Sequence, residues 1–306
     1  MIGSGGSSKV FSAFDSNKNL YAIKAIRKDK GYASEMESMI VLREYFVMEH
    51  IGEHPNIIKH YSCNPEGMIV HNDVQQPICY NVMEYCANGS LSTIVRNTGA
   101  IEESIARFMF VQLASAVQFL HEKKFAHLDI KLENILLDEW FNIKLADFGS
   151  GVSLVKTRGM TANRVGTPLY MPPEIKNLEK GQSFEGMKAD IYSFGVTLCL
   201  MLFGELPDFS MFDCDASTIG TNQMSSDDFM DVEMSEEKLS QRWKYLSASS
   251  KDLIQRMTNE DPNKRPTIEE VLAHEWVYFE SLDGLQSQVY LEMKARQQAI
   301  SNFQSL

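Results

Sequence analysis

The chain has 306 residues, of which 44% are hydrophobic and 23% are charged. These values are typical of a soluble globular protein that can bury one or two substantial cores. The net charge of −12 disfavours nonspecific binding to nucleic acid or to an anionic membrane surface. The longest nearly apolar run, Val196–Phe203, is far shorter than the roughly 20 residues that span a bilayer, so we expect no membrane partner.

The five cysteines are an odd number and lack the spacing of a zinc site. We therefore expect reduced thiols and an intracellular location, in the cytoplasm or also in the nucleus. The N-terminus carries no basic and apolar secretion signal, and it begins inside a glycine-rich motif. Residues before Met1 could therefore be missing.

Residues 2–10 are rich in glycine and serine. Such a stretch lets backbone N–H groups approach a phosphate, because glycine has no Cβ, although a flexible terminus fits the composition equally well. Two strands are expected next, at 10–14 and 20–26. In the second strand Lys24 shares a face with Ala22 and Ile26, so its ammonium needs a carboxylate partner unless it is exposed at an edge.

An amphipathic helix over residues 34–51 is the expected source of this partner. Glu44 is preferred, because Met48 and Ile51 follow it at +4 and +7, which puts all three near one face; a different helical register would favour Glu37. Further strands are expected at 57–61, 68–71 and 78–83, with a turn over Asn64–Gly67 between the first two.

The next helices lead to a stretch that is dense in polar groups. Ser90 is the expected N-cap of a helix that begins at Leu91, and a long amphipathic helix is expected over 101–123. Asp129, Lys131, Asn134 and Asp147, which supply two carboxylates, an ammonium and an amide, then lie within 19 residues. Apolar runs at 135–137 and 143–146 predict a hairpin that places these groups on one rim. Phosphoryl transfer needs such a rim, because a carboxylate accepts a hydroxyl proton while an amide and a carboxylate hold divalent metal.

The sequences His-Leu-Asp-Ile-Lys-Leu-Glu-Asn at 127–134 and Asp-Phe-Gly at 147–149 resemble the catalytic loop and the metal-binding motif of eukaryotic protein kinases. The resemblance covers residues 2–279. It implies an α+β, two-lobed protein kinase fold, with a small β-rich N-lobe at 1–84, a larger, mainly helical C-lobe at 85–279 and a helical tail at 280–306. Lys131 and Thr167 are typical of the serine/threonine branch.

The resemblance also implies roles for individual residues. Asp129 would be the catalytic base, Lys131 would contact the transferred phosphate, and Thr167 would bond toward both. Lys24, with Glu44 behind it, would orient the phosphates of ATP. Asn134 and Asp147 would hold Mg²⁺. Around the nucleotide the resemblance places Ile2, Gly3, Ser4, Gly5, Gly6, Val10, Ala22, Lys24, the gatekeeper Met83, Leu136 and the backbone of Glu84 and Cys86.

The chain departs from the family pattern in three places. Ser8 replaces the third glycine of the glycine-rich loop, and Pro172 stands where alanine is usual. Leu128 replaces the arginine that often precedes the catalytic aspartate, which makes this a non-RD variant of the catalytic loop. That arginine normally receives a phosphate on the activation segment. Our hypothesis is therefore that activity does not depend strongly on phosphorylation of residues 150–165.

Several expectations concern the rest of the C-lobe. Glu174 should pair with Arg265 and support the lobe. Asp190 opens an apolar helix that runs to about Phe203, and it bonds the backbone of the catalytic loop, caps that helix, or does both. Residues 205–237 contain ten acidic residues and no lysine or arginine, so they form a solvated loop or select basic protein substrates. Further helices are expected at 246–257, 267–274 and 285–305.

The sequence therefore predicts an ATP- and Mg²⁺-dependent protein serine/threonine kinase that transfers the γ-phosphoryl group to protein hydroxyls. A pseudokinase scaffold, which binds partners without catalysis, is the alternative from another functional class. The missing arginine and third glycine favour that alternative, whereas the intact Lys24, Asp129, Asn134 and Asp147 favour the enzyme. The oligomeric state is left open.

Overall fold

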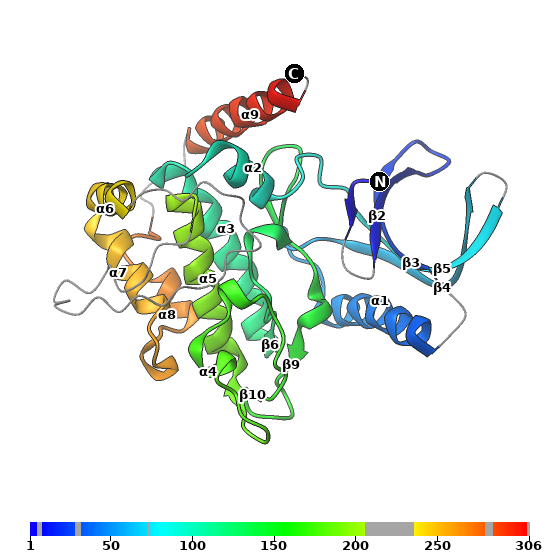
Figure 1. Ribbon diagram of the computed structural model, residues 1–306, viewed down its shortest axis with the longest axis horizontal. Helices are drawn as coiled ribbons and strands as arrows, with labels where there is room; N and C mark the ends of the chain where they lie inside the picture. Colours follow the sequence, from blue (N-terminus) through cyan, green and yellow to red (C-terminus); the bar gives the residue numbers. More distant parts are fainter. Residues whose placement is uncertain (5–7, 28–31, 72–73, 206–235, 279–283, 305–306) are drawn as a thin grey trace.

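The computed structural model describes residues 1–4, 8–27, 32–71, 74–205, 236–278 and 284–304. The chain forms a small lobe built on a β-sheet and a larger lobe built on helices (Figure 1). The expected α+β, two-lobed fold class is therefore confirmed. The expected boundaries at 84 and 279 stay predictions.

The small lobe contains an antiparallel sheet with the strand order β1-β2-β3-β5-β4. Helix α1 (Tyr32–Ile51) lies beside this sheet (Figure 1) and packs Val41 against Ile26 and Cys79. Buried side chains on β3 and β5 therefore orient the helix that follows β3. The strands are β1 (Gly3–Ser4), β2 (Lys9–Phe14), β3 (Leu20–Arg27), β4 (His60–His71) and β5 (Val74–Glu84).

The turn predicted over Asn64–Gly67 is wrong. Strand β4 continues through this stretch, and its register with β5 shifts between Asn64 and Gly67. Such a shift is a bulge, and Pro65 is tolerated there because β4 is an edge strand, so the missing N–H disrupts no second ladder. Residues 64–67 form a bulge and not a turn, because the residues on both sides of them pair with the same strand, β5.

The large lobe is organised around α5 (Gly186–Phe203). This helix is long and apolar enough to cross a membrane, but 89% of the relevant window is buried inside the protein, as expected for a core helix. Its Phe194 stacks on Phe110 with ring centroids 4.1 Å apart, and Trp276 meets Phe110 edge-on. The other α-helices of the described parts of this lobe are α2 (Leu91–Thr98), α3 (Glu103–Glu122), α4 (Pro173–Lys176), α6 (Glu236–Tyr245), α7 (Ala248–Met257), α8 (Ile268–Leu272) and α9 (Leu285–Gln304).

Local signals in the large lobe predicted some helix ends well and missed others. Ser90 caps α2 as expected, since its hydroxyl accepts a hydrogen bond from the Thr93 amide. The reading of Asp190 as an N-cap is wrong, because α5 begins at Gly186, one turn earlier. Helix α6 was not predicted. Most of the acidic segment, residues 206–235, lies outside the described residues.

The expected pair between Glu174 and Arg265 forms and closes the large lobe. The Arg265 guanidinium donates to both carboxylate oxygens of Glu174 at 2.6 and 2.8 Å, and its side chain is fully buried. It also donates to the carbonyl oxygens of Asn259, Lys188 and Glu260. A buried cation with this many partners ties α4 to the loop before α8.

We predict that Glu174→Gln lowers the free energy of unfolding by about 3 kcal/mol, because it leaves the Arg265 charge buried without its anion. Urea unfolding followed by circular dichroism measures this change. The matched control is Glu179→Gln on the exposed surface nearby, which should leave stability within about 0.5 kcal/mol. Equal stability of the two variants would contradict the assignment.

Candidate active site

Three charged groups from separate parts of the chain meet at Lys24. The Lys24 ammonium lies 2.8 Å from Glu44 Oε2 and 3.0 Å from Asp147 Oδ1. Glu44 lies on α1, its side chain is 1% exposed, and its other oxygen accepts a hydrogen bond from the Phe148 amide at 3.3 Å. The partner of Lys24 is therefore Glu44, and the contact joins β3, α1 and the Asp-Phe-Gly segment.

The electrostatics of this cluster keep Lys24 charged. Burial alone would lower the pKa of Lys24, but the carboxylates of Glu44 and Asp147 outweigh it and raise that pKa well above the usual range. Burial raises the pKa of Glu44, with Lys24 opposing. Burial also pushes the pKa of Asp147 upward, yet the adjacent ammonium holds it below its ordinary value. Asp147 thus stays ionised and available to a cation.

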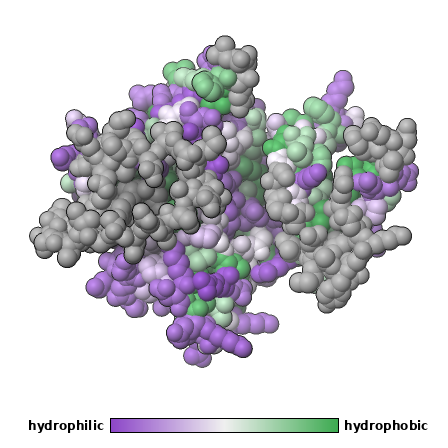
Figure 2. Space-filling view, in the orientation of Figure 1, coloured by the Kyte–Doolittle hydropathy of each residue, from purple (hydrophilic) through white to green (hydrophobic). Residues whose placement is uncertain are grey.

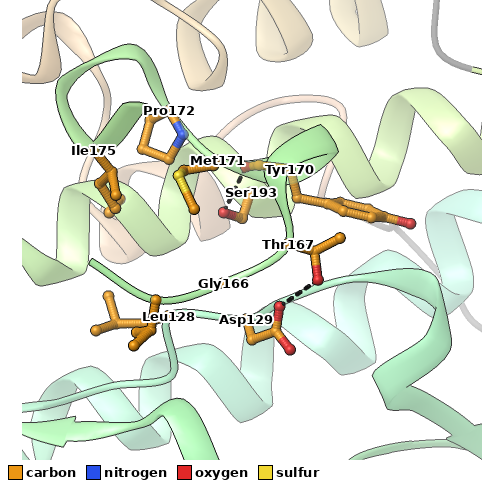
Figure 3. A pocket seen from close by; sticks show the side chains of 11 residues that line it. Leu128, Asp129, Gly166, Thr167, Tyr170, Met171, Pro172, Ile175 and Ser193 are labelled. Carbon is orange, nitrogen blue, oxygen red and sulfur yellow. Dashed lines mark hydrogen bonds between the residues drawn. The ribbon is translucent and has the colours of Figure 1, made fainter. Parts of the chain in front are cut away.

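The polar groups of the catalytic loop form a second cluster. The Lys131 ammonium lies 2.9 Å from Asp129 Oδ2 and donates to the Thr167 hydroxyl at 2.6 Å. That hydroxyl in turn donates to Asp129 Oδ1 at 2.9 Å, as Figure 3 shows. Asn134 Nδ2 donates to both the carbonyl and the carboxylate of Asp129, at 2.8 and 3.1 Å. Both carboxylate oxygens of Asp129 are therefore held in fixed directions.

A buried carboxylate inside the large lobe positions this loop. Asp190 on α5 is fully buried and accepts hydrogen bonds from the amides of His127 and Leu128 at 2.8 and 2.7 Å. The His121 ring lies 3.0 Å from the same carboxylate. Leu128 has a φ of 61°, which is rare outside glycine, and these hydrogen bonds offset the cost of that conformation. Of the two readings offered for Asp190, the bond to the catalytic-loop backbone is confirmed.

Asn134 and Asp147 fit a magnesium site. The predicted hairpin forms from β7 (Ile135–Leu137) and β8 (Ile143–Leu145), and it brings the ends of both strands together. The Ala146 amide donates to the Asn134 carbonyl at 2.8 Å, next to Asp147. Because the amide nitrogen of Asn134 points at Asp129, its oxygen is the atom left for a cation. One amide oxygen and one carboxylate suit Mg²⁺, which keeps waters and phosphate oxygens as its other ligands.

The described residues that were expected around a nucleotide lie on or next to the small sheet, in the segment that follows β5, and on β7. Val10 pairs with Lys24 across β2 and β3, and Ala22 pairs with Met83 across β3 and β5. The Ser90–Leu136 bridge places β7 against the segment that follows β5. Gly3 and Ser4 form β1, and the Ile2 amide donates to the Val10 carbonyl at 2.8 Å. Gly5 and Gly6 lie outside the described residues.

At the end of β5, two backbone groups already form hydrogen bonds. The Glu84 amide donates to the Lys59 carbonyl at 2.8 Å, and the Cys86 carbonyl accepts from the Gly89 amide at 3.3 Å. The expectation that the backbone of Glu84 and Cys86 binds an adenine stays a prediction.

A small pocket separates the catalytic loop from the segment at 165–175 (Figure 3). Gly166 has a φ of 109° in this segment, and a Cβ there would lie 2.6 Å from the Leu128 carbonyl oxygen. Only glycine allows this approach, and it delivers Thr167 to Asp129. Leu128 itself is 5% exposed and packs among apolar residues. Its cluster contains Ala126, Leu154, Ile175, Phe184 and Ala189, with Val165 and Met171 at the edge.

Sequence reasoning missed His60, the first residue of β4. Both ring nitrogens are buried and have no hydrogen-bond partner among the described residues. Burial, followed by the charge of Lys24, lowers the pKa of His60 to about 4. His60 also pairs with Met83 across the strands. No local pattern could have found it, because its isolation depends on how α1 and β5 pack around β4.

We predict that His60 makes the fold sensitive to acid. Its folded-state pKa lies below its unfolded value, so its contribution to stability is complete above about pH 6.5 and is lost as the pH falls toward 4. At pH 5 the expected loss is about 2 kcal/mol. His60→Leu removes this loss and two unsatisfied atoms, so its thermal midpoint should exceed that of the wild type most at pH 5.

Thermal unfolding at pH 7.5 and pH 5 measures the effect, with His50→Gln as a control on the exposed end of α1. An equal drop between the two pH values in the wild type and in His60→Leu would show that His60 is not responsible.

Comparison with known proteins agrees with this geometry. The protein kinase domain matches residues 1–277. CBL-interacting serine/threonine-protein kinase 7 of Arabidopsis thaliana is 33% identical over 277 residues, which cover 90% of this chain and 58% of that protein. NUAK family SNF1-like kinase 2 of Homo sapiens is 33% identical over 276 residues, or 90% of this chain and 39% of the relative.

A third relative, serine/threonine-protein kinase chk1 of Schizosaccharomyces pombe, is 31% identical over 282 residues, which cover 90% of this chain and 52% of the relative. The chain thus spans roughly half the length of these curated relatives, or less. The fold, the two polar clusters and these matches lead to one conclusion: the chain belongs to the protein kinase domain family, and its relatives include serine/threonine-protein kinases.

Proposed function

We propose that this protein is an active, ATP-dependent protein serine/threonine kinase. The observation that carries the proposal is the closed contact of Lys24 with Glu44 and Asp147, at 2.8 and 3.0 Å. A lysine that orients phosphates, a carboxylate that holds metal and a fixed catalytic base are the parts that phosphoryl transfer requires. Side chains of each of these types are present in the described chain, which supports the proposal.

In the proposed reaction the acceptor hydroxyl binds at Asp129. Asp129 takes the proton of the acceptor hydroxyl while the hydroxyl oxygen forms a bond to the γ-phosphorus of ATP. The bond between that phosphorus and the β,γ-bridging oxygen breaks, which releases ADP. Lys131 and Thr167 hold the Asp129 carboxylate at 2.9 Å each, so its direction is set before the acceptor arrives. Positioning of this kind supplies much of the rate.

The nucleotide would be oriented by both lobes. Lys24 offers its ammonium to the phosphates, and the Cys86 amide and Glu84 carbonyl meet the adenine edge. Asn134 and Asp147 would hold Mg²⁺, which neutralises charge on the phosphate oxygens when bound. The glycine-rich stretch that begins at Gly3 would cover the phosphates with backbone N–H groups.

A pseudokinase scaffold remains the second candidate. The observation in its favour is Leu128, which leaves the activation segment without the guanidinium that usually receives a phosphate. The Leu128 side chain, however, makes apolar contacts of its own. It is buried in the apolar cluster under Ile175 and Val165, and this packing can hold the segment in place without a charge. Burying a leucine side chain contributes about 2 kcal/mol.

Substrates, partners and location stay proposals. The acidic composition of residues 205–237 supports a preference for basic protein substrates. Partners other than proteins, such as nucleic acid or membranes, are not expected from the charge, and an intracellular location follows from the cysteines alone.

The first test is phosphate transfer from radiolabelled ATP to a lysine- and arginine-rich acceptor protein, with an acidic acceptor for comparison. Asp129→Ala and Asp129→Asn should lower kcat by about 10²- to 10⁴-fold, because they remove the base. Both variants should keep the wild-type thermal midpoint and bind MgATP. The matched control is Glu139→Gln on the exposed turn between β7 and β8, which should retain activity. Unchanged turnover in Asp129→Ala refutes the proposed role.

The second test concerns the non-RD catalytic loop. We predict that protein treated with phosphatase keeps at least about half of its turnover, since Leu128 offers a phosphate no bidentate partner. Mass spectrometry of residues 150–165 verifies that the phosphate has been removed. The hypothesis is dropped if the treated protein loses nearly all turnover and regains it on rephosphorylation.

A further inference from the structure

Helix α9 lies beyond the family match, which ends at residue 277, yet it is built into the large lobe. Its Val289 and Met293 are 1% and 0% exposed and belong to the main core. Tyr290 contacts the rings of Phe141 and Trp140, with centroids 5.7 and 6.2 Å apart. Helix α9 lies next to α2 in Figure 1, and the contacts between the two helices agree.

One turn of α9 holds the C-terminal end of α2. The Arg296 guanidinium donates to the Thr98 hydroxyl at 2.9 Å and to the carbonyl oxygens of Thr98, Gly99 and Ala100 at 3.4, 3.2 and 3.0 Å. Its Nε pairs with Glu292 at 2.8 Å, which fixes the direction of the fork. The last carbonyls of a helix have no partners within the helix and carry partial negative charge, so a guanidinium fits there.

The adjacent residue holds the other end of the same segment. Gln297 Nε2 donates to Asn88 Oδ1 at 2.7 Å. Asn88 is bound to β7 and the turn after it, because its amide donates to the Leu137 carbonyl at 3.1 Å and its side chain donates to the Asp138 carbonyl at 2.6 Å. Arg296 and Gln297 therefore grip both ends of residues 88–100, which follow the expected adenine-binding backbone.

Residues 88–100 contact two parts of the proposed site. Near its start, Ser90 bridges to Leu136, one of the residues expected under the nucleotide. Within α2, Ser92 and Arg96 donate to Glu133 Oε1 at 3.3 and 3.0 Å, and Glu133 directly precedes Asn134. A helix of only eight residues is not stable by itself, so its position depends on its attachments.

We propose that α9 is a clamp for residues 88–100, and that Arg296 and Gln297 are positioning residues for the nucleotide site. This inference rests on the proposed function. Without the clamp, the carbonyls at the end of α2 would turn to water and α2 would move relative to β7 and Glu133. Apolar side chains also gather over α9, at the top of Figure 2. The exposed fractions of its Leu291 and Phe303 are 67% and 82%, and the clamp does not need these two side chains.

The experiment compares Arg296→Ala, Arg296→Lys and Gln297→Ala in the full chain, with Gln298→Ala on the exposed side of the same turn as control. Steady-state kinetics are measured well below the thermal midpoint of each variant. Arg296→Ala should raise KM for ATP by about fivefold with kcat within about twofold, since a change in KM alone marks lost binding. Arg296→Lys should fall between the wild type and Arg296→Ala, because lysine keeps the charge and loses the fork.

Amide hydrogen exchange supplies a readout that does not require activity. Residues 88–100 should lose protection in Arg296→Ala and, to a smaller extent, in Gln297→Ala, while α5 keeps its protection. If Arg296→Ala does not fold, Arg296→Lys and Gln297→Ala carry the same comparison. A fall in thermal midpoint with unchanged KM and unchanged exchange over 88–100 would overturn the clamp, as would equal behaviour of all variants and Gln298→Ala.

The failure of the clamp can be told apart from the failure of the proposed function. If the wild type neither binds MgATP by calorimetry nor transfers phosphate, the proposed function fails and the link to nucleotide binding fails with it. If the wild type is active but the variants match it in KM and in exchange, the proposed function stands and only the clamp is wrong.

Discussion

The structure depends on the neutralisation of one buried ammonium group. Lys24 sits on a central strand of the small sheet, where an unpaired charge would be costly, and it is satisfied by Glu44 from α1 and Asp147 from the large lobe. These three groups come from segments that are far apart in the chain. The two ion pairs between them hold α1 against the sheet and bring the Asp-Phe-Gly segment next to it. The small lobe is thereby tied to the segment that carries the expected metal ligand.

A second buried charge performs a similar task inside the large lobe. Asp190 lies on α5, is fully buried and accepts hydrogen bonds from the amides of His127 and Leu128, so the catalytic loop is attached to the most buried helix of the described chain. From there the network passes through Asp129, Lys131 and Thr167. These contacts would preorganise the side chains for the proposed reaction.

The large lobe replaces charge with apolar packing at one point. Where the family often places an arginine, Leu128 packs with Ala126, Leu154 and Ile175 and keeps the activation segment against the catalytic loop. Gly166 complements it, because the left-handed backbone at that residue avoids a clash with the Leu128 carbonyl. This packing supports the proposal that the segment keeps its position without a phosphate. The tail helix α9 adds a further support from outside the matched domain.

The sequence by itself determined the order of the motifs, the hairpin of β7 and β8, the cap at Ser90 and the pairs Lys24–Glu44 and Glu174–Arg265. These follow from local spacing, from hydrophobic periodicity or from family resemblance, all of which are written in short stretches of chain. Only the tertiary structure decided that Asn64–Gly67 bends a strand, that Asp190 lies inside a helix, that His60 has no hydrogen-bond partner in the described parts of the chain and that Arg296 caps α2. Each of these depends on which distant segment packs nearby, and a buried polar group is satisfied or left unsatisfied by neighbours that no local pattern specifies.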